Sequence, residues 1–463
     1  MNFLRKAPQS LSHRLTNHPS TSASGRKEIK RIVVGATRSS TRSLSSSASQ
    51  SHWKQYEMGP PDPIVGLNEA FAVDDNPYKV NVGVGAYRTD DGLPYVLPCV
   101  REAEAINMNN PSLNHEYLGI AGDATFVNLA MEFVYGKDSK VLEDNGSHNG
   151  NGSCVAAVQT LSGTGGLRVF GELLARKGGH KEIYVPNPTW GNHIPIFQNA
   201  GLIVKKYRYY DAGISGLEFD NLIADFKAMP EGSVVLLHAC AHNPTGMDPT
   251  PEQWSEISKV VKEGKLIPFF DCAYQGFASG NAPQDAFAIR KFIDDGHLLA
   301  TVQSFSKNFG LYGQRVGALS IVCQDPNEAK KVLSQMKMTI RPMYSNPPRH
   351  GAQLVKTILE DDRLTTDFID QCSDMADRIN AMRVKLRSTL EEGTGGGRNR
   401  NWGHITDQIG MFAYSGLAKS EVEALRDNHS IYCTLDGRIS MAGVTSGNVN
   451  YIADAINDVV SNK

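Results

Sequence analysis

A lysine, Lys307, lies in the stretch SFSKNFGLYGQR, between two serines and two glycines and just past the apolar run LLATVQ. Most lysines are solvated surface charges. A lysine at the end of a buried strand can instead act as a nucleophile, because desolvation lowers its pKa and leaves more of it neutral. The nucleophile interpretation requires partner groups at the ends of neighbouring strands.

Residues whose side chains can bind a ligand or take part in a reaction follow other apolar runs of strand length in the same way. In an open parallel sheet, ligands bind outside the carboxyl ends of the strands, so such a sheet would gather these residues along one edge. In chain order they are Ser162, Gly163, Thr164, Trp190, His193, Asn243, Asp271, Tyr274, Ser304, Ser306 and Lys307.

Each of these residues, taken singly, also has a purely structural explanation. The Ser-Gly-Thr-Gly stretch at 162–165 can be a turn with a helix cap, and Asp271 can cap a helix. Trp190 can belong to the core, and Asn243 lies in Asn-Pro-Thr-Gly, which is a common turn sequence. A single cofactor explains the whole set better than separate structural roles do.

That cofactor is pyridoxal phosphate. It needs a lysine for its aldehyde, a carboxylate for its pyridine nitrogen, and an anion site such as a helix start for its phosphate. It also needs an aromatic surface over the ring and hydrogen-bond partners for the ring oxygen. The matching residues are, in that order, Lys307, Asp271, 162–164, Trp190, and Tyr274 with Asn243.

The segment from 153 to 323 alternates short apolar runs with amphipathic ones, which predicts strands separated by helices. One helix start is especially clear, with Thr250 as N-cap, Pro251 at the first position and Gln253 at the third. Fully apolar strands of this kind are typical of a mostly parallel sheet covered on both faces. The seven predicted strands are 154–161, 182–188, 201–210, 233–240, 266–271, 298–304 and 317–323.

The predicted fold is therefore α/β, with a large domain built on this sheet and a smaller α/β domain at the C-terminus. From about residue 325 the sequence predicts long helices with charged faces. The predicted division is a transit peptide at 1–50, an N-terminal arm with part of the small domain at 51–95, a large cofactor-binding domain at 96–360 and a small domain at 361–463. Two Gly- and Asn-rich stretches, 145–153 and 392–401, are predicted surface loops.

The first fifty residues contain nine Lys and Arg against one acidic residue, together with many Ser and Thr. This pattern is typical of an organelle transit peptide, with a disordered basic tail as the alternative. Without this segment 38 basic and 48 acidic residues remain, a net charge of −10, which does not indicate a nucleic-acid-binding surface.

Two further classes are disfavoured. The longest apolar runs fall short of the about 20 residues that cross a bilayer, so we expect no membrane span. The seven cysteines are widely spaced and form no CxxC pair, which argues against a disulfide framework and against a zinc site. We therefore predict no metal.

Eight motifs make the chain similar to the aspartate aminotransferases, which are class I aminotransferases of the fold-type I pyridoxal-phosphate enzymes. The resemblance runs from about residue 53 to the end, and the segment WKQYEMGPPDPIVGLNEAF resembles the mature start of the mitochondrial type. The motifs, in family order, are NVGVGAYRTDDGLPYVLP, LSGTGGLR, NPTWGNH, HACAHNPTG, FFDCAYQGFASG, SFSKNFGLYGQRVGAL, IRPMYSNPPRHGA and DGRISMAG.

The resemblance implies a role for each matching cofactor residue. Lys307 would be the Schiff-base lysine and proton shuttle, Asp271 would bind the pyridine nitrogen, and His193 would support Asp271. The other implied cofactor contacts are Tyr274 and Asn243 at the ring oxygen, Trp190 on the ring, and Ser162, Gly163, Thr164, Ser304, Ser306 and Arg315 at the phosphate.

The resemblance also implies how substrate is bound. Arg438 would clamp the α-carboxylate beside Gly85, and Trp190 and Asn243 would contact the substrate as well. In a homodimer with shared active sites, the partner would contribute two further residues, Arg341 for the side-chain carboxylate and Tyr117 for the phosphate. Two guanidinium forks suit a dicarboxylate.

The predicted activity is therefore a ping-pong transamination between L-aspartate with 2-oxoglutarate and oxaloacetate with L-glutamate, in the mitochondrial matrix or alternatively in a plastid. Three rival classes remain. An aromatic or broad-specificity aminotransferase would have the same cofactor and the same Arg438, and a lyase or decarboxylase would have the same fold type. The third class is a non-catalytic binding or structural protein, against which the intact Lys307, Asp271, phosphate loop and both arginines argue.

Overall fold

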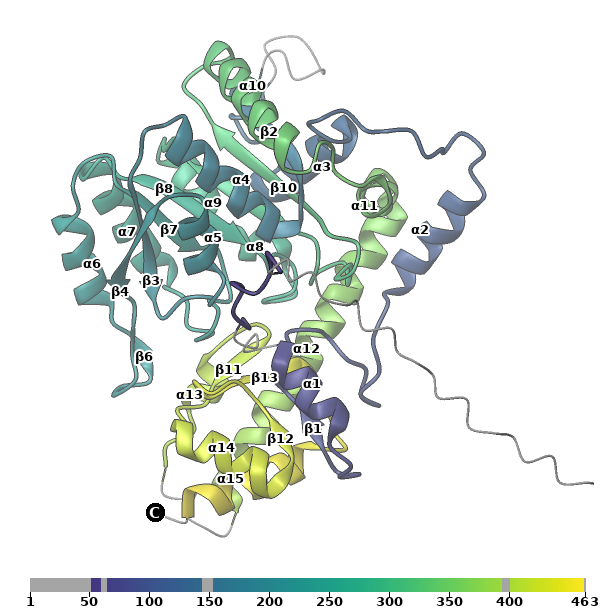
Figure 1. Ribbon diagram of the computed structural model, residues 1–463, viewed down its shortest axis with the longest axis vertical. Coiled ribbons are helices and arrows are strands. Elements are labelled where there is room, and N and C mark those ends of the chain that lie inside the picture. Colours follow the sequence, from purple (N-terminus) through teal and green to yellow (C-terminus); the bar gives the residue numbers. More distant parts are fainter. Residues whose placement is uncertain (1–50, 60–64, 144–152, 394–399, 462–463) are drawn as a thin grey trace, which may run out of the picture. The chain divides into compact units, whose positions relative to one another are not determined.

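The computed structural model describes residues 51–59, 65–143, 153–393 and 400–461 (Figure 1). The chain divides into two compact units, 1–60 and 61–463. In the first, residues 52–55 form a turn. The second contains the helices and strands discussed below. The predicted transit peptide at 1–50 and nearly all of the predicted loop at 145–153 lie outside the described residues.

Seven strands of the described chain form one sheet, in the order β2-β10-β9-β8-β7-β3-β4. Six of them run parallel, and β10 lies antiparallel between β2 and β9. The prediction of a mostly parallel seven-stranded sheet is confirmed. The strands are β2 (Val155–Leu161), β3 (Glu182–Asn187), β4 (Ile203–Arg208), β7 (Val234–His238), β8 (Ile267–Cys272), β9 (Ala300–Ser304) and β10 (Val316–Val322).

Helices cover both faces of this sheet, because successive side chains of a strand point to opposite faces. In β7, Leu236 packs in the cluster formed with α4 (Ser162–Arg176), α5 (His193–Asn199) and α10 (Pro326–Met343). The next residue, Leu237, belongs to the cluster on the other face. The helices of that cluster next to the sheet are α3 (Ala124–Tyr135), α6 (Phe219–Ala228), α7 (Pro251–Glu263) and α9 (Phe287–Asp294).

The predicted start of α7 is confirmed in detail. The Thr250 hydroxyl accepts a hydrogen bond from the Gln253 N–H at 3.3 Å, and the Gln253 side-chain oxygen accepts one from the Thr250 N–H at 2.9 Å. This capping box satisfies two backbone donors that a helix start otherwise leaves unpaired.

The C-terminal part of the chain contains the long helix α12 (Asp362–Glu392), a further helix that packs on it and two small sheets. Near the start of α12, the Phe368 ring stacks on Phe309 with ring centroids 3.9 Å apart. Farther along, α12 packs on α15 (Val449–Ser461) (Figure 1). Two small sheets complete this part, one pairing β11 (Phe412–Tyr414) with β13 (Arg438–Ser440) and one pairing β1 (Val80–Asn81) with β12 (Ile431–Tyr432).

The remaining elements are short or peripheral to the main sheet. These elements are α1 (Val65–Val73), α2 (Pro98–Met108), β5 (Tyr210–Asp211), β6 (Gly216–Leu217), α8 (Ala282–Asp285), α11 (Arg349–Glu360), α13 (His404–Asp407), α14 (Lys419–His429) and the 3₁₀ turn η2 (Met441–Gly443).

The domain boundaries at 95 and 360 stay a prediction.

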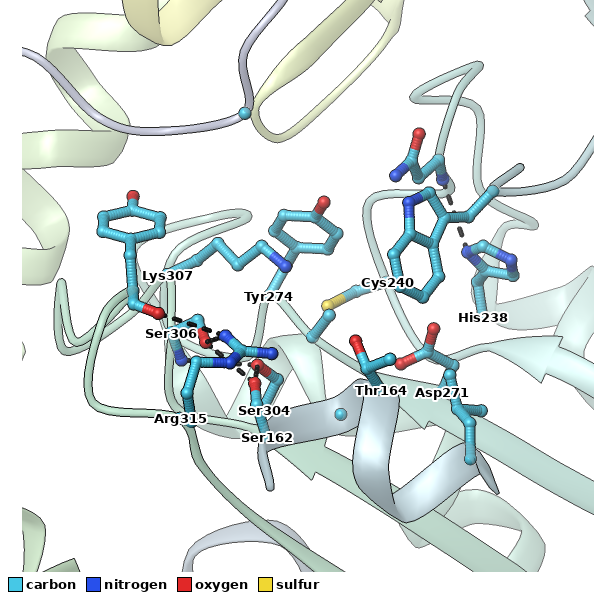
Figure 2. Close-up of a pocket in the computed structure, with 17 residues that line it drawn as sticks. Ser162, Thr164, His238, Cys240, Asp271, Tyr274, Ser304, Ser306, Lys307 and Arg315 are labelled. Carbon is cyan, nitrogen blue, oxygen red and sulfur yellow. Dashed lines mark hydrogen bonds between the residues drawn. The ribbon is translucent and has the colours of Figure 1, made fainter. Parts of the chain in front are cut away.

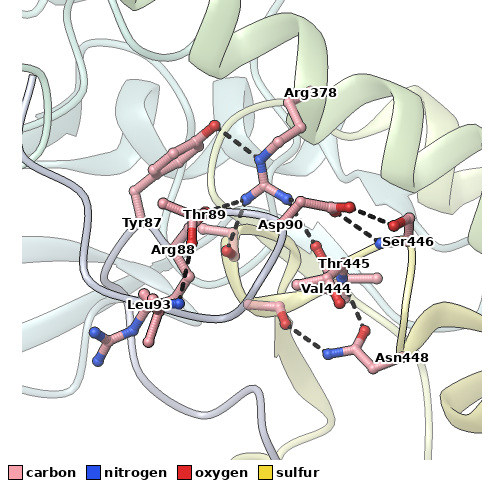
Figure 3. A network of polar contacts seen from close by, with 12 residues as sticks. Tyr87, Arg88, Thr89, Asp90, Leu93, Arg378, Val444, Thr445, Ser446 and Asn448 are labelled. Carbon is pink, nitrogen blue, oxygen red and sulfur yellow. Dashed lines mark hydrogen bonds and ion pairs between the residues drawn. The ribbon is translucent and has the colours of Figure 1, made fainter.

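A polar network anchors the segment after β1 to the C-terminal part (Figure 3). Arg378 of α12 donates to the Tyr87 hydroxyl at 2.7 Å and to the Val444 carbonyl at 3.1 Å, and its guanidinium lies 4.6 Å from the centre of the Tyr87 ring. The Asp90 carboxylate accepts a hydrogen bond from the Ser446 N–H at 2.8 Å. The network holds the backbone that leads from Gly85 to α2.

Candidate active site

A pocket opens at the carboxyl ends of β7, β8 and β9, where the parallel topology predicts it (Figure 2). Its volume is about 230 Å³, far more than the about 10–15 Å³ that one water needs. Twelve residues proposed from sequence line it together: Gly85, Ser162, Gly163, Thr164, Trp190, Asn243, Asp271, Tyr274, Ser304, Ser306, Lys307 and Arg315.

Lys307 follows β9 by three residues and is half-buried. Its ammonium nitrogen lies 5.2 Å from the centre of the Tyr274 ring. Burial lowers the pKa of Lys307 below that of an ordinary lysine; the Asp271 carboxylate opposes this effect, and the cations of Arg315 and Arg438 add to it. A larger neutral fraction makes this amine a better nucleophile and base near neutral pH.

Asp271 lies in β8 and lines the pocket. Its Oδ2 is 3.0 Å from Nε2 of His193, whose Nδ1 is 2.7 Å from the Thr189 hydroxyl. Burial acts to raise the pKa of Asp271, but the hydrogen bond from His193 and nearby positive charge, that of Lys307 included, outweigh it, so the pKa lies below its usual value. An ionised carboxylate is therefore available to hold a positive charge.

Three hydroxyls and a guanidinium converge at the start of α4 (Figure 2). The Ser162 Oγ lies 2.9 Å from the Ser304 Oγ and 2.8 Å from the Ser306 Oγ, and Arg315 donates to Ser306 at 3.3 Å. Ser162 is the first residue of α4, not a loop residue before it. The unpaired N–H groups and positive dipole end of a helix start attract anions. This cradle suits a phosphate group.

The cradle depends on a close approach of backbones at Gly317 of β10. A Cβ atom built there would lie 2.5 Å from the Gln303 carbonyl oxygen and 2.7 Å from the carbonyl carbon of Ser162. Ser162 itself has a positive φ of 59°, so its backbone is already constrained. No sequence pattern signals this contact, because it joins residues that are distant along the chain.

Arg438 lies beside the pocket and is almost fully buried. It donates to the Asn243 side-chain oxygen at 3.2 Å and to the Gly83 carbonyl at 2.9 Å, and its guanidinium carbon lies 4.1 Å from the centre of the Phe412 ring. Its Nε has no hydrogen-bond partner among the described residues. The guanidinium thus retains free donors for a carboxylate.

Arg341 and Tyr117 do not line the pocket of their own chain. Arg341 is exposed on α10 and donates to the Ser345 hydroxyl at 2.5 Å. Tyr117 is 83% exposed. Both side chains are therefore accessible at the surface of the chain.

Sequence reasoning missed five lining residues, although the motifs above contained all of them. His238 ends the apolar run of β7 with a ring nitrogen, Nδ1, that accepts a hydrogen bond from the Asn243 N–H at 3.3 Å. The Tyr312 hydroxyl accepts one from the Tyr87 N–H at 2.9 Å. The missed residues are Leu167, His238, Cys240, Ala273 and Tyr312.

The described residues contain neither a metal-ligand cluster nor a membrane-spanning helix. No group of three or more His, Cys, Asp or Glu side chains there is arranged to hold a metal ion. Among the same residues, no helix has both the length and the apolar character needed to cross a membrane.

The fold and the pocket define a fold-type I pyridoxal-phosphate aminotransferase. Residues 77–456 match the family model of class I and II aminotransferases, and the chain belongs to this family. The resemblance inferred from the motifs is thereby confirmed.

The similarity to individual relatives extends over most of the chain. The chain is 52% identical over 409 residues to the mitochondrial aspartate aminotransferase of Arabidopsis thaliana, and the matched region covers 88% of this chain and 92% of that protein. It is 49% identical over 414 residues to the cytoplasmic aspartate aminotransferase of Oryza sativa subsp. japonica, covering 89% and 99%. A solved aromatic-amino-acid aminotransferase from Burkholderia pseudomallei, covalently bound to pyridoxal phosphate, superposes with a TM-score of 0.83 at 39% identity, covering 89% and 100%.

We predict that Gly317→Ala destabilises the protein by roughly 1–3 kcal/mol, because the new methyl group meets backbone atoms that cannot rotate away. Urea unfolding measures this change. Gly313→Ala is the matched control, since a Cβ there meets nothing within 4 Å. Equal stabilities of the two variants would contradict the close approach at Gly317.

We also predict that the protein loses folding stability at acidic pH because His238 is buried. Burial, helped by the charge of His193, lowers the pKa of His238 to about 3, whereas an unfolded histidine has a pKa of about 6.5. Between these values the unfolded chain binds a proton that the folded chain does not, so stability falls as the pH falls below about 6.5. From pH 7 to pH 5, His238 alone should lower the free energy of unfolding by roughly 2 kcal/mol.

The check is urea unfolding at both pH values. His238→Asn should lose less stability on acidification than the wild type does. His115→Asn, the same substitution at an exposed histidine, is the matched control. If His238→Asn has the wild-type pH dependence, His238 is not held neutral by the fold.

Proposed function

We propose that this protein is a pyridoxal-phosphate-dependent aspartate transaminase, which interconverts L-aspartate with 2-oxoglutarate and oxaloacetate with L-glutamate. The observation that carries the proposal is one pocket containing Lys307, the ionised Asp271 and the hydroxyl cradle, with Arg438 beside it. Relatives of this name are about half identical over nearly nine-tenths of the chain.

The described residues fit pyridoxal phosphate. When bound, this cofactor supplies an aldehyde that an amine can attack and a ring that takes up electrons while its nitrogen is protonated. Asp271, whose pKa is lowered, is suited to keep that nitrogen protonated. The further proposed contacts are Tyr274 and Asn243 at the ring oxygen, Trp190 on the ring, and Ser162, Gly163, Thr164, Ser304, Ser306 and Arg315 at the phosphate.

Lys307 holds and moves the proton. Its burial lowers its pKa and so raises the neutral fraction of the amine above that of an ordinary lysine. A neutral amine can take a proton from the α-carbon of the substrate and return it to the carbon two atoms away, across the nitrogen, in a 1,3-proton shift. The amino acid and the keto acid use the same pocket in turn, so the proposed kinetics are ping-pong.

Two arginines would select the substrate. Arg438 has five N–H donors and commits two of them, to Asn243 and Gly83, which leaves three for the α-carboxylate. Gly85 lines the pocket nearby. We assign the side-chain carboxylate to Arg341, which favours dicarboxylic substrates.

Arg341 can fill that role only in an assembly. It lies outside the pocket of its own chain, as does the exposed Tyr117. We therefore propose a homodimer in which the partner contributes both residues to the site, Tyr117 at the phosphate and Arg341 at the substrate. We also propose that residues 96–360 form the cofactor-binding domain and 361–463 the small domain.

The second candidate is an aromatic or broad-specificity aminotransferase. It is favoured by the close superposition on an aromatic-amino-acid aminotransferase. Lys307, Asp271 and Arg438 serve both activities alike, so the two candidates differ only in the side-chain end of the pocket.

We place the enzyme in the mitochondrial matrix, with the plastid as the alternative. The support is the basic, Ser-rich segment at 1–50 and the mitochondrial relative in Arabidopsis thaliana. A similar cytoplasmic relative shows that the family also works elsewhere.

Replacing Lys307 by Ala should lower the rate of transamination of aspartate at least about thousandfold, because both the nucleophile and the base are lost. The measurement is oxaloacetate formed per enzyme in a single half-reaction. Lys265→Ala, at an exposed lysine paired with Glu231, is the control and should react as the wild type does. Wild-type turnover of Lys307→Ala would refute the proposed chemistry.

Replacing Arg341 by Asp tests the substrate assignment. We expect kcat/KM for aspartate to fall about a hundredfold or more, because a charge-assisted pair becomes a repulsion, while alanine loses little. Arg438→Asp is the comparison, since every amino acid carries the α-carboxylate and all should lose activity together. An equal loss on aspartate and alanine in Arg341→Asp would remove Arg341 from its proposed role.

A further inference from the structure

The guanidinium of Arg438 rests on an aromatic ring. Its central carbon lies 4.1 Å from the centre of the Phe412 ring, and both side chains are almost fully buried. A cation over a ring face is attracted by the ring quadrupole, most strongly where water is excluded. The two residues lie on adjacent strands, β11 and β13, whose register pairs Phe412 with Ser440 and Arg438 with Tyr414. They are therefore diagonal neighbours on one face.

The Phe412 ring is itself tightly held. A Cβ atom built on Gly85, which lines the pocket, would lie 2.7 Å from the tip of the Phe412 ring. The Tyr274 ring meets Phe412 edge-on, with centroids 6.4 Å apart. Phe412 thus fills the space between a pocket-lining backbone and Arg438.

The backbone carbonyl of Phe412 accepts a hydrogen bond from a buried charged side chain. Arg383 of α12 is 2% exposed and donates to the carbonyl oxygens of Ile405, Gly410 and Phe412, the last at 2.5 Å. These bonds tie β11 to the long helix. The ring under Arg438 is therefore rigidly placed before any substrate binds.

We propose that Phe412 is a positioning residue for substrate binding, because it holds the plane of the Arg438 guanidinium ready for the α-carboxylate. This inference rests on the role proposed for Arg438. Only two hydrogen bonds from the described chain orient that guanidinium, and its Nε is unpaired among the same residues. The ring supplies the remaining constraint, so a carboxylate binds without first ordering the arginine.

The proposal makes Phe412 act on every substrate alike. All amino acids and keto acids of the reaction carry the carboxylate that Arg438 would bind, whereas only dicarboxylates use Arg341. Loss of the ring should therefore weaken aspartate and alanine by the same factor. Cofactor binding should stay unchanged, since Phe412 is not one of the residues that line the pocket.

The test compares the holoenzyme with Phe412→Leu. Succinate is titrated while the absorbance of the bound cofactor is followed, and KM and kcat are measured for aspartate and for alanine. We expect succinate affinity to fall about five- to tenfold, and both KM values to rise by the same factor, because the arginine must be ordered on binding. We expect kcat to change less than about twofold.

A control variant and a substitute test variant separate a positioning role from general damage to the fold. Phe226→Leu removes a ring that is equally buried but lies in α6, and it should leave succinate affinity and KM unchanged. If Phe412→Leu does not fold, Phe412→Met retains the buried volume and gives the same test.

Unchanged succinate affinity in a ring-less variant that retains its cofactor would overturn the proposal. So would a parallel loss of cofactor and of kcat, which would indicate a purely structural role. A wild-type protein that does not transaminate aspartate would instead refute the proposed function itself, so the two failures are distinguishable.

Discussion

The buried carboxylate of Asp271 is the group on which the rest of the site depends. Burial alone would raise its pKa, and the fold surrounds it with compensating groups that lower it. The hydrogen bond from His193, oriented in turn by Thr189, is the main one. Lys307 supplies another, because the two opposite charges lie near the same strand ends. Desolvation, which acts to raise the pKa of Asp271, also lowers the pKa of Lys307 and so makes the lysine more reactive.

Parallel topology explains how groups so distant in sequence come together. Asp271 lies one residue before the end of β8, beside His238 and Val302 of the neighbouring strands, and the residues after those strands form the pocket wall. The antiparallel β10 then lies between β9 and β2, and Gly317 lets its backbone approach Ser162. The hydroxyl cradle is thus assembled from three chain segments whose backbones are already fixed, so binding an anion requires little further ordering.

Much of this arrangement could be predicted from local sequence. Buried strands are read from unbroken apolar runs such as the one at Val234–His238, and the start of α7 from the capping residues around Thr250. The direction of β10 could not be predicted, because composition does not encode strand direction. Nor could the stack of Arg438 on Phe412 or the place of His238 in the pocket, since both depend on tertiary contacts between distant segments. Family resemblance supplied Arg438 and Arg341, which no strand-end pattern would have singled out.

The most direct measurement of the central claim locates the cofactor on the chain. The purified protein is treated with borohydride, which makes a carbon–nitrogen double bond between cofactor and lysine permanent, and its peptides are then weighed by mass spectrometry. The account predicts a pyridoxyl group on the peptide that contains Lys307 and on no other. A pyridoxyl group on a different lysine, or none at all in a protein supplied with pyridoxal phosphate, would contradict it.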